Sequence, residues 1–118
     1  MGQSRKPAVD AEAHLGLVHV CANRFRSRGI EYEELYSAGC LGLVKAANAF
    51  EPERGVCFST YAVPVILGEI RRLFRENGAV HVGRRLQELS RRAAREAERL
   101  RQANGAEPTV RQVADALG

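Results

Sequence analysis

The chain has 118 residues, which is enough for one domain or for one domain and the beginning of a second. Hydrophobic residues make up 45% of it, so a buried core is expected, but the length excludes a large enzyme. The formal net charge is +4, and the three cysteines never form a Cys-x-x-Cys pair, which argues against a secreted disulfide framework. We therefore expect a protein of the reducing cytoplasm.

Neither an export signal nor a membrane span is predicted. Asp10, Glu12 and His14 interrupt the apolar stretch that a signal peptide would need. The longest nearly apolar run, residues 62–67, includes Pro64 and is far shorter than the roughly 20 residues of a membrane helix. We expect no contact with a membrane.

Apolar residues recur at spacings of three and four along the chain, without the alternation of strands, and this predicts an all-α fold. The first helix is expected over residues 10–28, with Gly29 as its C-terminal glycine. Residues 32–38 and 40–50 predict two further helices that meet near Gly39. Small residues would let the backbones of these two helices approach each other closely, and they are Gly39, Gly42, Ala46 and Ala47.

A longer helix is expected over residues 58–76, after a loop at residues 51–55. Ser59 would cap this helix, and Pro64 would bend it or make its start irregular. Its inner face would consist of Ala62, Ile66, Ile70 and Leu73.

Residues 84–103 predict a basic helix after a linker at residues 78–83. Thr109, followed three residues later by Gln112, is a capping-box signal that opens a last helix. This helix has barely formed at Gly118, so we expect a domain that continues beyond it. The apolar seam of the basic helix would be Leu86, Leu89, Ala93, Ala97 and Leu100.

The excess positive charge lies in the second half of the chain. Residues 1–58 hold seven basic and seven acidic side chains, whereas residues 59–118 hold eleven basic and seven acidic ones. Between Arg71 and Arg101 there are ten Arg and four Glu. Arginine pairs bidentately with phosphates and guanine edges, which favours a polyanionic partner. A solvated, ion-paired helix face would explain the charge equally well.

The histidines and cysteines indicate neither catalysis nor a metal site. His14, His19 and His81 have no nucleophile or carboxylate at a spacing that would build a relay, and no Cys and His spacing matches a structural zinc site. We expect no cofactor and no catalysis. The cysteines are expected to act as small apolar residues, at Cys21, Cys40 and Cys57.

Phe58 and Tyr61 stand at the beginning of the predicted helix 58–76, whose outer face is rich in arginine. Aromatic rings beside arginines suit unpaired bases that stack while the cations hold the phosphates. The alternative is that both rings only anchor the core.

Several short stretches, in the same order along the chain, resemble the motifs of one protein family. They are Leu15 to Val18, Glu34 to Leu43, Ala46 to Phe50, Phe58 to Pro64, Gly68 to Arg72, and Glu107 to Val110. From about His14 to Gly118 the sequence resembles the bacterial sigma factors of the sigma-70 family, the promoter-recognition subunits of RNA polymerase. Tyr61 to Pro64 and Gly68 to Arg72 are most similar to the sporulation branch, particularly its forespore members.

The resemblance implies three parts of the chain. Residues 1–13 would form a poorly ordered N-terminal segment. Residues 14–78 would form sigma region 2, a compact helical domain that binds core polymerase and recognises the minus-ten element. Residues 79–118 would begin region 3 with the long basic helix, and the fourth region, which reads the minus-thirty-five element, is expected beyond Gly118.

The resemblance also implies roles for single residues. Contacts with the clamp coiled coil of core polymerase would come from Glu34, Leu35, Ser37, Cys40 and Leu43. Phe58 and Tyr61 would help to open the minus-ten element and to capture its flipped adenine.

Further DNA contacts are implied downstream of these two rings. By helical spacing Pro64, Gly68, Arg71 and Arg75 share one stripe. The residues implied to contact DNA on this helix are Gly68, Arg71, Arg72 and Arg75, followed by Arg84, Arg85 and Glu88 beside the extended minus-ten DNA.

The expected function is that of a sigma factor, or a fragment of one, that binds core RNA polymerase and promoter DNA and directs minus-ten recognition and melting. An anti-sigma factor is a further candidate partner. The alternative is a truncated interaction module that occupies the clamp or an anti-sigma factor without initiating transcription. Housekeeping members carry two Trp where this chain has Pro64 and Val65, which predicts weaker melting at imperfect promoters.

Overall fold

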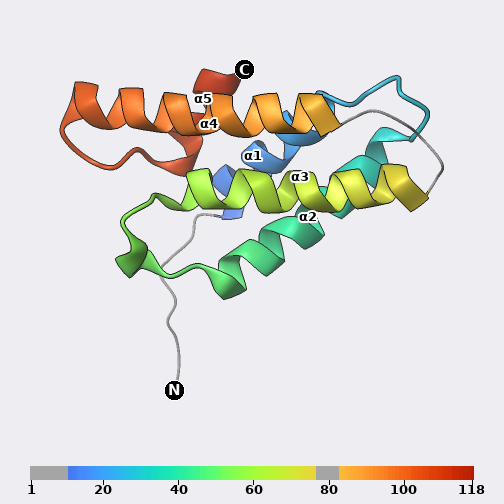
Figure 1. Cartoon of the computed structure of the whole chain (residues 1–118), viewed down its shortest axis with the longest axis horizontal. Coiled ribbons are helices and arrows are strands. Elements are labelled where there is room, and N and C mark those ends of the chain that lie inside the picture. Colours follow the sequence, from blue (N-terminus) through green and yellow to red (C-terminus); the bar gives the residue numbers. More distant parts are fainter. Residues whose placement is uncertain (1–10, 77–82) are drawn as a thin grey trace.

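The computed structural model describes residues 11–76 and 83–118, and every regular element in these two ranges is a helix (Figure 1). The expected all-α fold is thereby confirmed. The first ten residues and most of the predicted linker lie outside the described ranges, and so does His81. The helices are α1 Ala11–Asn23, α2 Tyr32–Ala49, the short 3-10 helix η1 Pro52–Arg54, α3 Phe58–Glu76, α4 Gly83–Asn104 and α5 Val110–Leu117.

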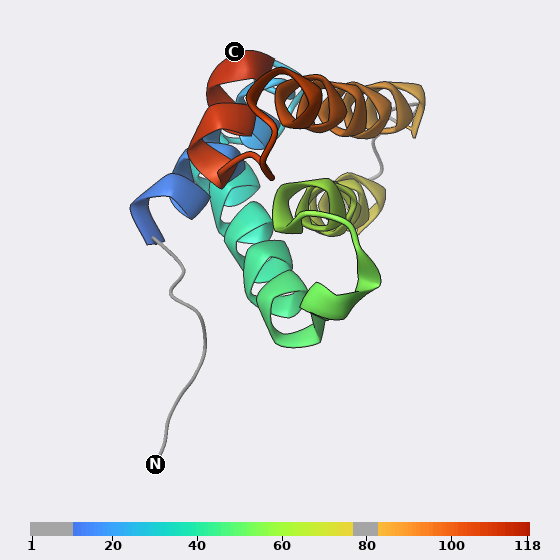
Figure 2. The same ribbon diagram turned by 90° about the vertical axis from the view of Figure 1, so that its left-hand side faces the viewer.

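Helices α3 and α4 lie side by side and run in opposite directions (Figure 1). Helix α2 crosses behind α3, and α1 packs against α2 on one side and α5 on the other (Figures 1 and 2). Seen along α3 and α4, the helices enclose a single interior (Figure 2). No described helix is both long and apolar enough to cross a membrane.

The buried residues form one cluster to which every α-helix contributes. The inner face of α3 supplies the largest share, and complete burial of one large aliphatic side chain contributes about 1.5–3 kcal/mol. The core position of α3 therefore follows from its own amphipathic pattern. Its buried apolar residues are Ala62, Val63, Ile66, Leu67, Ile70 and Phe74.

Two glycines let α2 pack closely against neighbouring helices, Gly42 against α3 and Gly39 against α1, rather than letting two short helices pack against each other as predicted. A Cβ atom added to Gly42 would lie 2.6 Å from the Cα of Ile66 and 2.9 Å from the carbonyl oxygen of Val65. A Cβ added to Gly39 would lie 2.8 Å from Cγ1 of Val18 on α1. The contact at Gly42 is between backbones, so a larger residue there would push α2 and α3 apart.

Helices α4 and α5 cover the core from the other side. Of the predicted seam, Leu89, Ala93 and Ala97 are buried, as expected, and Leu100 is half-buried against the core. The capping box is also confirmed, because the backbone N–H of Gln112 donates to Thr109 Oγ1 over 3.1 Å, and that of Thr109 donates to Gln112 Oε1 over 2.9 Å.

Helix α1 ends at Asn23, which corrects the prediction of a helix that reaches residue 28. The backbone N–H of Phe25 donates to the carbonyl of Ala22, three residues back, over 3.0 Å, and Ser27 and Gly29 have positive φ. The chain therefore leaves the helix through tight turns, while Phe25 still points into the core.

Helix α2 is continuous through Gly39, so the predicted pair of helices is wrong. The close packing of α2 against its neighbours offsets the low helix propensity of glycine, which costs about 1 kcal/mol relative to alanine. Leu41 and Val44 on this helix are 49% and 55% exposed.

Helix α3 begins at Phe58, so Ser59 lies within the helix rather than at its cap, and its side chain is buried. The helix is continuous through Pro64, and the expected irregular start is absent. Pro64 itself is on the solvent side.

Candidate nucleic-acid interface

The outer face of α3 carries the predicted stripe. Pro64, Gly68, Arg71 and Arg75 are all exposed. Because these residues are spaced by three and four, they follow one side of the helix, opposite its buried face. The structure therefore presents two of the three predicted arginines of α3 together with Gly68.

A groove runs between this stripe and α4. Pro64, Gly68 and Arg71 line it from α3 with Leu67, and its volume is about 350 Å³. Helix α4 contributes polar and basic side chains that the sequence prediction did not include, since only a tertiary contact brings the two helices together. These side chains are Gln87, Ser90 and Arg91.

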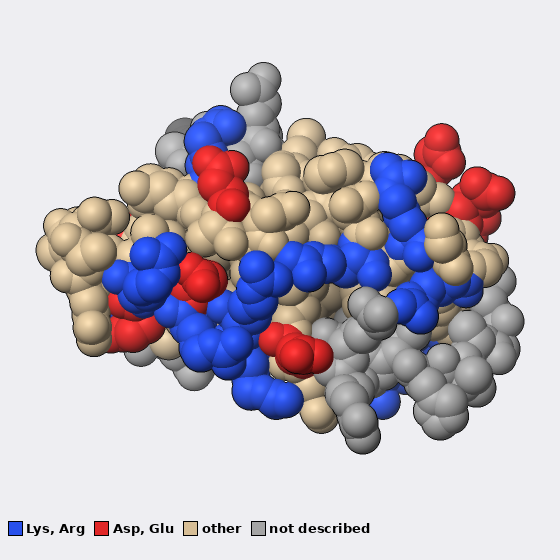
Figure 3. Space-filling model, turned by 90° about the horizontal axis from the view of Figure 1, so that it is seen from above, with Lys and Arg blue, Asp and Glu red and all other residues tan. Residues whose placement is uncertain are grey.

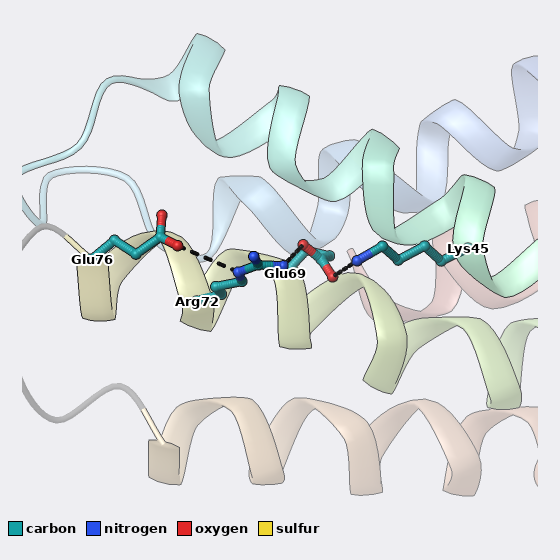
Figure 4. A network of polar contacts seen from close by, with 4 residues as sticks. All are labelled: Lys45, Glu69, Arg72 and Glu76. Atoms are coloured by element: carbon teal, nitrogen blue, oxygen red, sulfur yellow. Dashed lines mark hydrogen bonds and ion pairs between the residues drawn. The ribbon is translucent and has the colours of Figure 1, made fainter.

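Arg72, the third predicted arginine, belongs to a different side of α3. Its Nε lies 3.3 Å from Oε2 of Glu76, and its Nη1 lies 3.8 Å from Oε1 of Glu69. Glu69 in turn accepts a 2.7 Å hydrogen bond from Nζ of Lys45 on α2 (Figure 4). Two acidic residues thus surround Arg72, whereas no ion pair is found for Arg71 or Arg75 within the described part of the chain.

The aromatic pair lies at the beginning of α3. Phe58 and Tyr61 are half-buried, so each ring has one side in the protein and part of its surface in solvent. Phe50 lies 5.2 Å from Phe58 and 5.6 Å from Tyr61 between ring centroids, and His14 lies 4.9 Å from Phe58. Both interpretations of the pair are compatible with this geometry, because the rings pack on the core and remain partly exposed.

The residues predicted to bind polymerase follow α2, but they do not share one face. Glu34 and Ser37 are exposed, and Cys40 and Leu43 are half-buried. Leu35 is fully buried, so it supports α2 from within and offers no surface to a partner. The exposed apolar surface of α2 is instead supplied by two side chains outside the predicted set, Leu41 and Val44.

Helix α4 adds positive charge beside the groove. Figure 3 shows Lys and Arg side chains in a band across the face that carries α4, with acidic side chains between them. Glu88 is exposed, and Arg84 and Arg85 occupy the first turn of α4, where their side chains lie outside the described part. Ion pairs join Arg99 to Glu96 and Arg101 to Glu98. The band on α4 is therefore partly neutralised.

Only the thiol of Cys21 fits the expected apolar role, because Cys40 shares a hydrogen bond with Tyr36 and the Sγ of Cys57 lies 3.4 Å from Ser59 Oγ and 3.2 Å from Thr60 Oγ1. All three cysteines are free, and burial raises the pKa of Cys21 to about 12. Burial also raises the pKa of Cys40, while a side-chain hydrogen bond with Tyr36 lowers it by a smaller amount. No cluster of His, Cys, Asp and Glu suited to a metal ion is found in the described residues.

The sequence is similar to characterised sporulation sigma factors. It is 44% identical over 106 residues to the RNA polymerase sigma-F factor of Bacillus licheniformis, which covers 90% of this chain and 42% of that protein. It is 42% identical over 106 residues to the sigma-G factor of Clostridium acetobutylicum, over 90% of this chain and 41% of that protein. It is 45% identical over 107 residues to the sigma-F factor of Kitasatospora aureofaciens, over 90% of this chain and 36% of that protein. The chain thus spans about two fifths of the length of these relatives.

An all-α domain with an arginine-bearing helix face and an adjoining aromatic pair defines a class of helical proteins suited to nucleic acid. Residues 11–80 match the family described as Sigma-70 region 2, which is more than half of the chain. The chain belongs to this family.

Proposed function

We propose that this chain is the polymerase-binding and promoter-reading part of a sigma factor. It binds core RNA polymerase and directs recognition and melting of the minus-ten element, without catalysis of its own. The observation that supports the proposal most directly is the arrangement of α3. One continuous helix presents the partly exposed rings of Phe58 and Tyr61 at its beginning and the exposed stripe of Gly68, Arg71 and Arg75 further along. The sigma-F and sigma-G relatives support the same function.

The proposed division of tasks follows the exposure of the helices. The clamp coiled coil of core polymerase would contact the exposed side of α2 at Glu34 and Ser37, with Leu41 and Val44 as apolar anchors, and the half-buried Cys40 and Leu43 would lie at the edge of this contact. An anti-sigma factor, the further candidate partner, would cover the same exposed apolar surface. The action would take place in the cytoplasm, where polymerase works.

The DNA would run from the beginning of α3 towards its end. Phe58 and Tyr61 would hold a base that has left the duplex, because stacking on an aromatic ring offsets part of the cost of unstacking. Gly68 and Arg71 would face the upstream base pairs of the element, and Arg71 and Arg75 would each neutralise a phosphate beside them. Arg84, Arg85 and Glu88 would lie beside the extended minus-ten DNA.

The test uses the 118-residue chain with core polymerase and two promoters, one fully paired and one already melted over the minus-ten element. We expect Tyr61→Ala to retain polymerase binding and to open the paired promoter about 10-fold or more slowly, since loss of one stacking contact costs about 1–3 kcal/mol. Tyr61→Phe, which keeps the ring, is the matched control. Promoter opening is followed by permanganate reactivity of the exposed thymines.

Two results would count against the proposal. Equal opening by Tyr61→Ala and the parent chain would remove Tyr61 from the site. A parent chain that binds polymerase but yields no transcript from the melted promoter would favour the interaction module that lacks an initiating role.

A further inference from the structure

Phe50 is the central member of an aromatic cluster that joins α2 to α3. Its ring meets Phe58 nearly edge to face, with centroids 5.2 Å apart and an interplanar angle of 82°. It also meets Tyr61, with centroids 5.6 Å apart and the rings tilted by 44°. Phe50 is thus the ring that contacts both aromatic residues proposed to open the promoter, and neither the sequence motifs nor the helix stripe assign it a role.

The backbone of Phe50 is fixed by α2. It is the first residue after that helix, and its N–H donates to the carbonyl oxygen of Ala46 over 2.9 Å. Helix α2 is itself held against α3 by the backbone contact between Gly42 and Ile66. The backbone of Phe50 therefore has a defined position relative to α3 before any DNA arrives, and its half-buried ring lies against Phe58 and Tyr61.

A fixed neighbour matters for Tyr61 because its ring is only half-buried. Without a contact on its protein side, the ring would sample several rotamers, and a stacking base would have to restrict them on binding. Offset and edge contacts between aromatic rings are favourable, so Phe50 restricts the ring in advance.

We propose that Phe50 is a positioning residue for promoter opening, which holds the rings of Phe58 and Tyr61 in the orientation that receives an unpaired base. The proposal rests on the proposed function. Phe50 acts through the two rings and need not touch DNA. Its effect should therefore appear in the opening step and not in polymerase binding.

The first experiment observes the ring contact without DNA or polymerase. The chain has three tyrosines, so labelling with 3-fluorotyrosine should give three fluorine resonances, and Tyr61→Phe assigns one of them. We expect Phe50→Leu to shift the Tyr61 resonance and to leave those of Tyr32 and Tyr36 in place. An unchanged Tyr61 resonance would overturn the proposal.

The second experiment measures opening of the paired and the melted promoter by the chain with core polymerase. We expect Phe50→Leu to slow opening of the paired promoter about three- to tenfold, the range that corresponds to loss of one or two aromatic contacts. The melted promoter should be used equally well by variant and parent. Phe50→Tyr keeps the ring and should restore opening.

Phe25→Leu is the matched control for a general loss of stability. Phe25 is fully buried and pairs with Phe74, with centroids 6.0 Å apart, so the same change there removes an aromatic contact from the core. Thermal unfolding fixes a temperature at which both variants are folded. If Phe25→Leu slows opening as much as Phe50→Leu, Phe50 has only a structural role and the proposal fails.

The two experiments separate this proposal from the proposed function. A parent chain that supports transcription from neither promoter would refute the proposed function and the role of Phe50 in opening together. In that case the fluorine resonances would still decide whether Phe50 holds the ring of Tyr61. Normal opening by the parent and by Phe50→Leu would refute the role of Phe50 alone.

Discussion

Helices α3 and α4 lie side by side and both present arginines to solvent, yet they are attached to the protein in different ways. Helix α3 buries Val63, Ile66, Leu67, Ile70 and Phe74 in the centre of the core. The buried seam of α4, among its described side chains, has one large residue and two alanines, Leu89, Ala93 and Ala97.

The difference shows that the buried face of a helix determines how firmly the arginines on its exposed face are held. The side chains of α3 are directed by a densely packed inner face, whereas those of α4 depend on a narrow seam and on α5. In protein–DNA complexes, base contacts carry the sequence information and phosphate contacts carry none. On the proposed function, the densely packed α3 would make the base contacts and the less firmly held α4 would contact phosphate.

Gly42→Val should remove the difference between α3 and α4, because it disrupts the close packing of α2 against α3. The added Cβ would meet the Ile66 Cα at 2.6 Å, and backbone cannot give way as a side chain can. We expect a loss of about 3 kcal/mol or more in the free energy of unfolding, measured with urea. Gly16→Ala in α1, where no atom lies within 4 Å of the new Cβ, is the control and should be neutral or slightly stabilising. A Gly42→Val variant as stable as the parent would contradict the close helix contact.

Ile66→Ala in α3 and Leu89→Ala in α4 measure how firmly each helix is held, because each removes one aliphatic side chain from the core. Ile66 is completely buried and Leu89 is 6% exposed. We expect losses of about 4 kcal/mol for Ile66→Ala and about 2 kcal/mol for Leu89→Ala, because α4 can settle into the space more easily. Hydrogen exchange should show the effect of Leu89→Ala mainly in α4 and α5. Equal losses spread over all helices would mean that both are held in the same way.

Arg71→Ala and Arg72→Ala give the smallest expected effect and compare two faces of one helix. Arg71 lines the groove, whereas Arg72 is engaged by Glu69 and Glu76. In the complex with core polymerase, Arg71→Ala should make the negative slope of log affinity for DNA against log salt less steep by about 0.7–0.9, the share of one phosphate. Arg72→Ala should change the slope less. The reverse order would place the DNA on the α2 side of α3.

Most of the helices could be predicted from the spacing of apolar residues by three and four, but their ends could not. Phe25 continues the stripe of the first helix, so the period extends into turns that only the positive φ of Ser27 and Gly29 reveals. The glycine at position 39 suggested a break, since its tertiary neighbours are not visible in the local sequence.

The candidate site was predictable where it lies on one helix. Helical spacing placed Gly68, Arg71 and Arg75 together, and the structure agrees. The same spacing leaves Arg72 off this stripe, but only the structure shows that its partner Glu69 is also held by Lys45 of another helix. The sequence assigns no role to Phe50 for a similar reason, because its contacts with Phe58 and Tyr61 join two elements that only the fold brings together.

The close backbone approach at Gly42 fixes the distance between α2 and α3. On the proposed function, the polymerase would bind α2 and the opened base would bind α3, so the absence of a side chain at Gly42 would set the distance between these two binding surfaces. On the proposed function, this fixed separation would set the distance from the enzyme at which the first base pair is broken. A change of one methyl group at Gly42 would then alter the alignment of promoter and polymerase even in a chain that still folds.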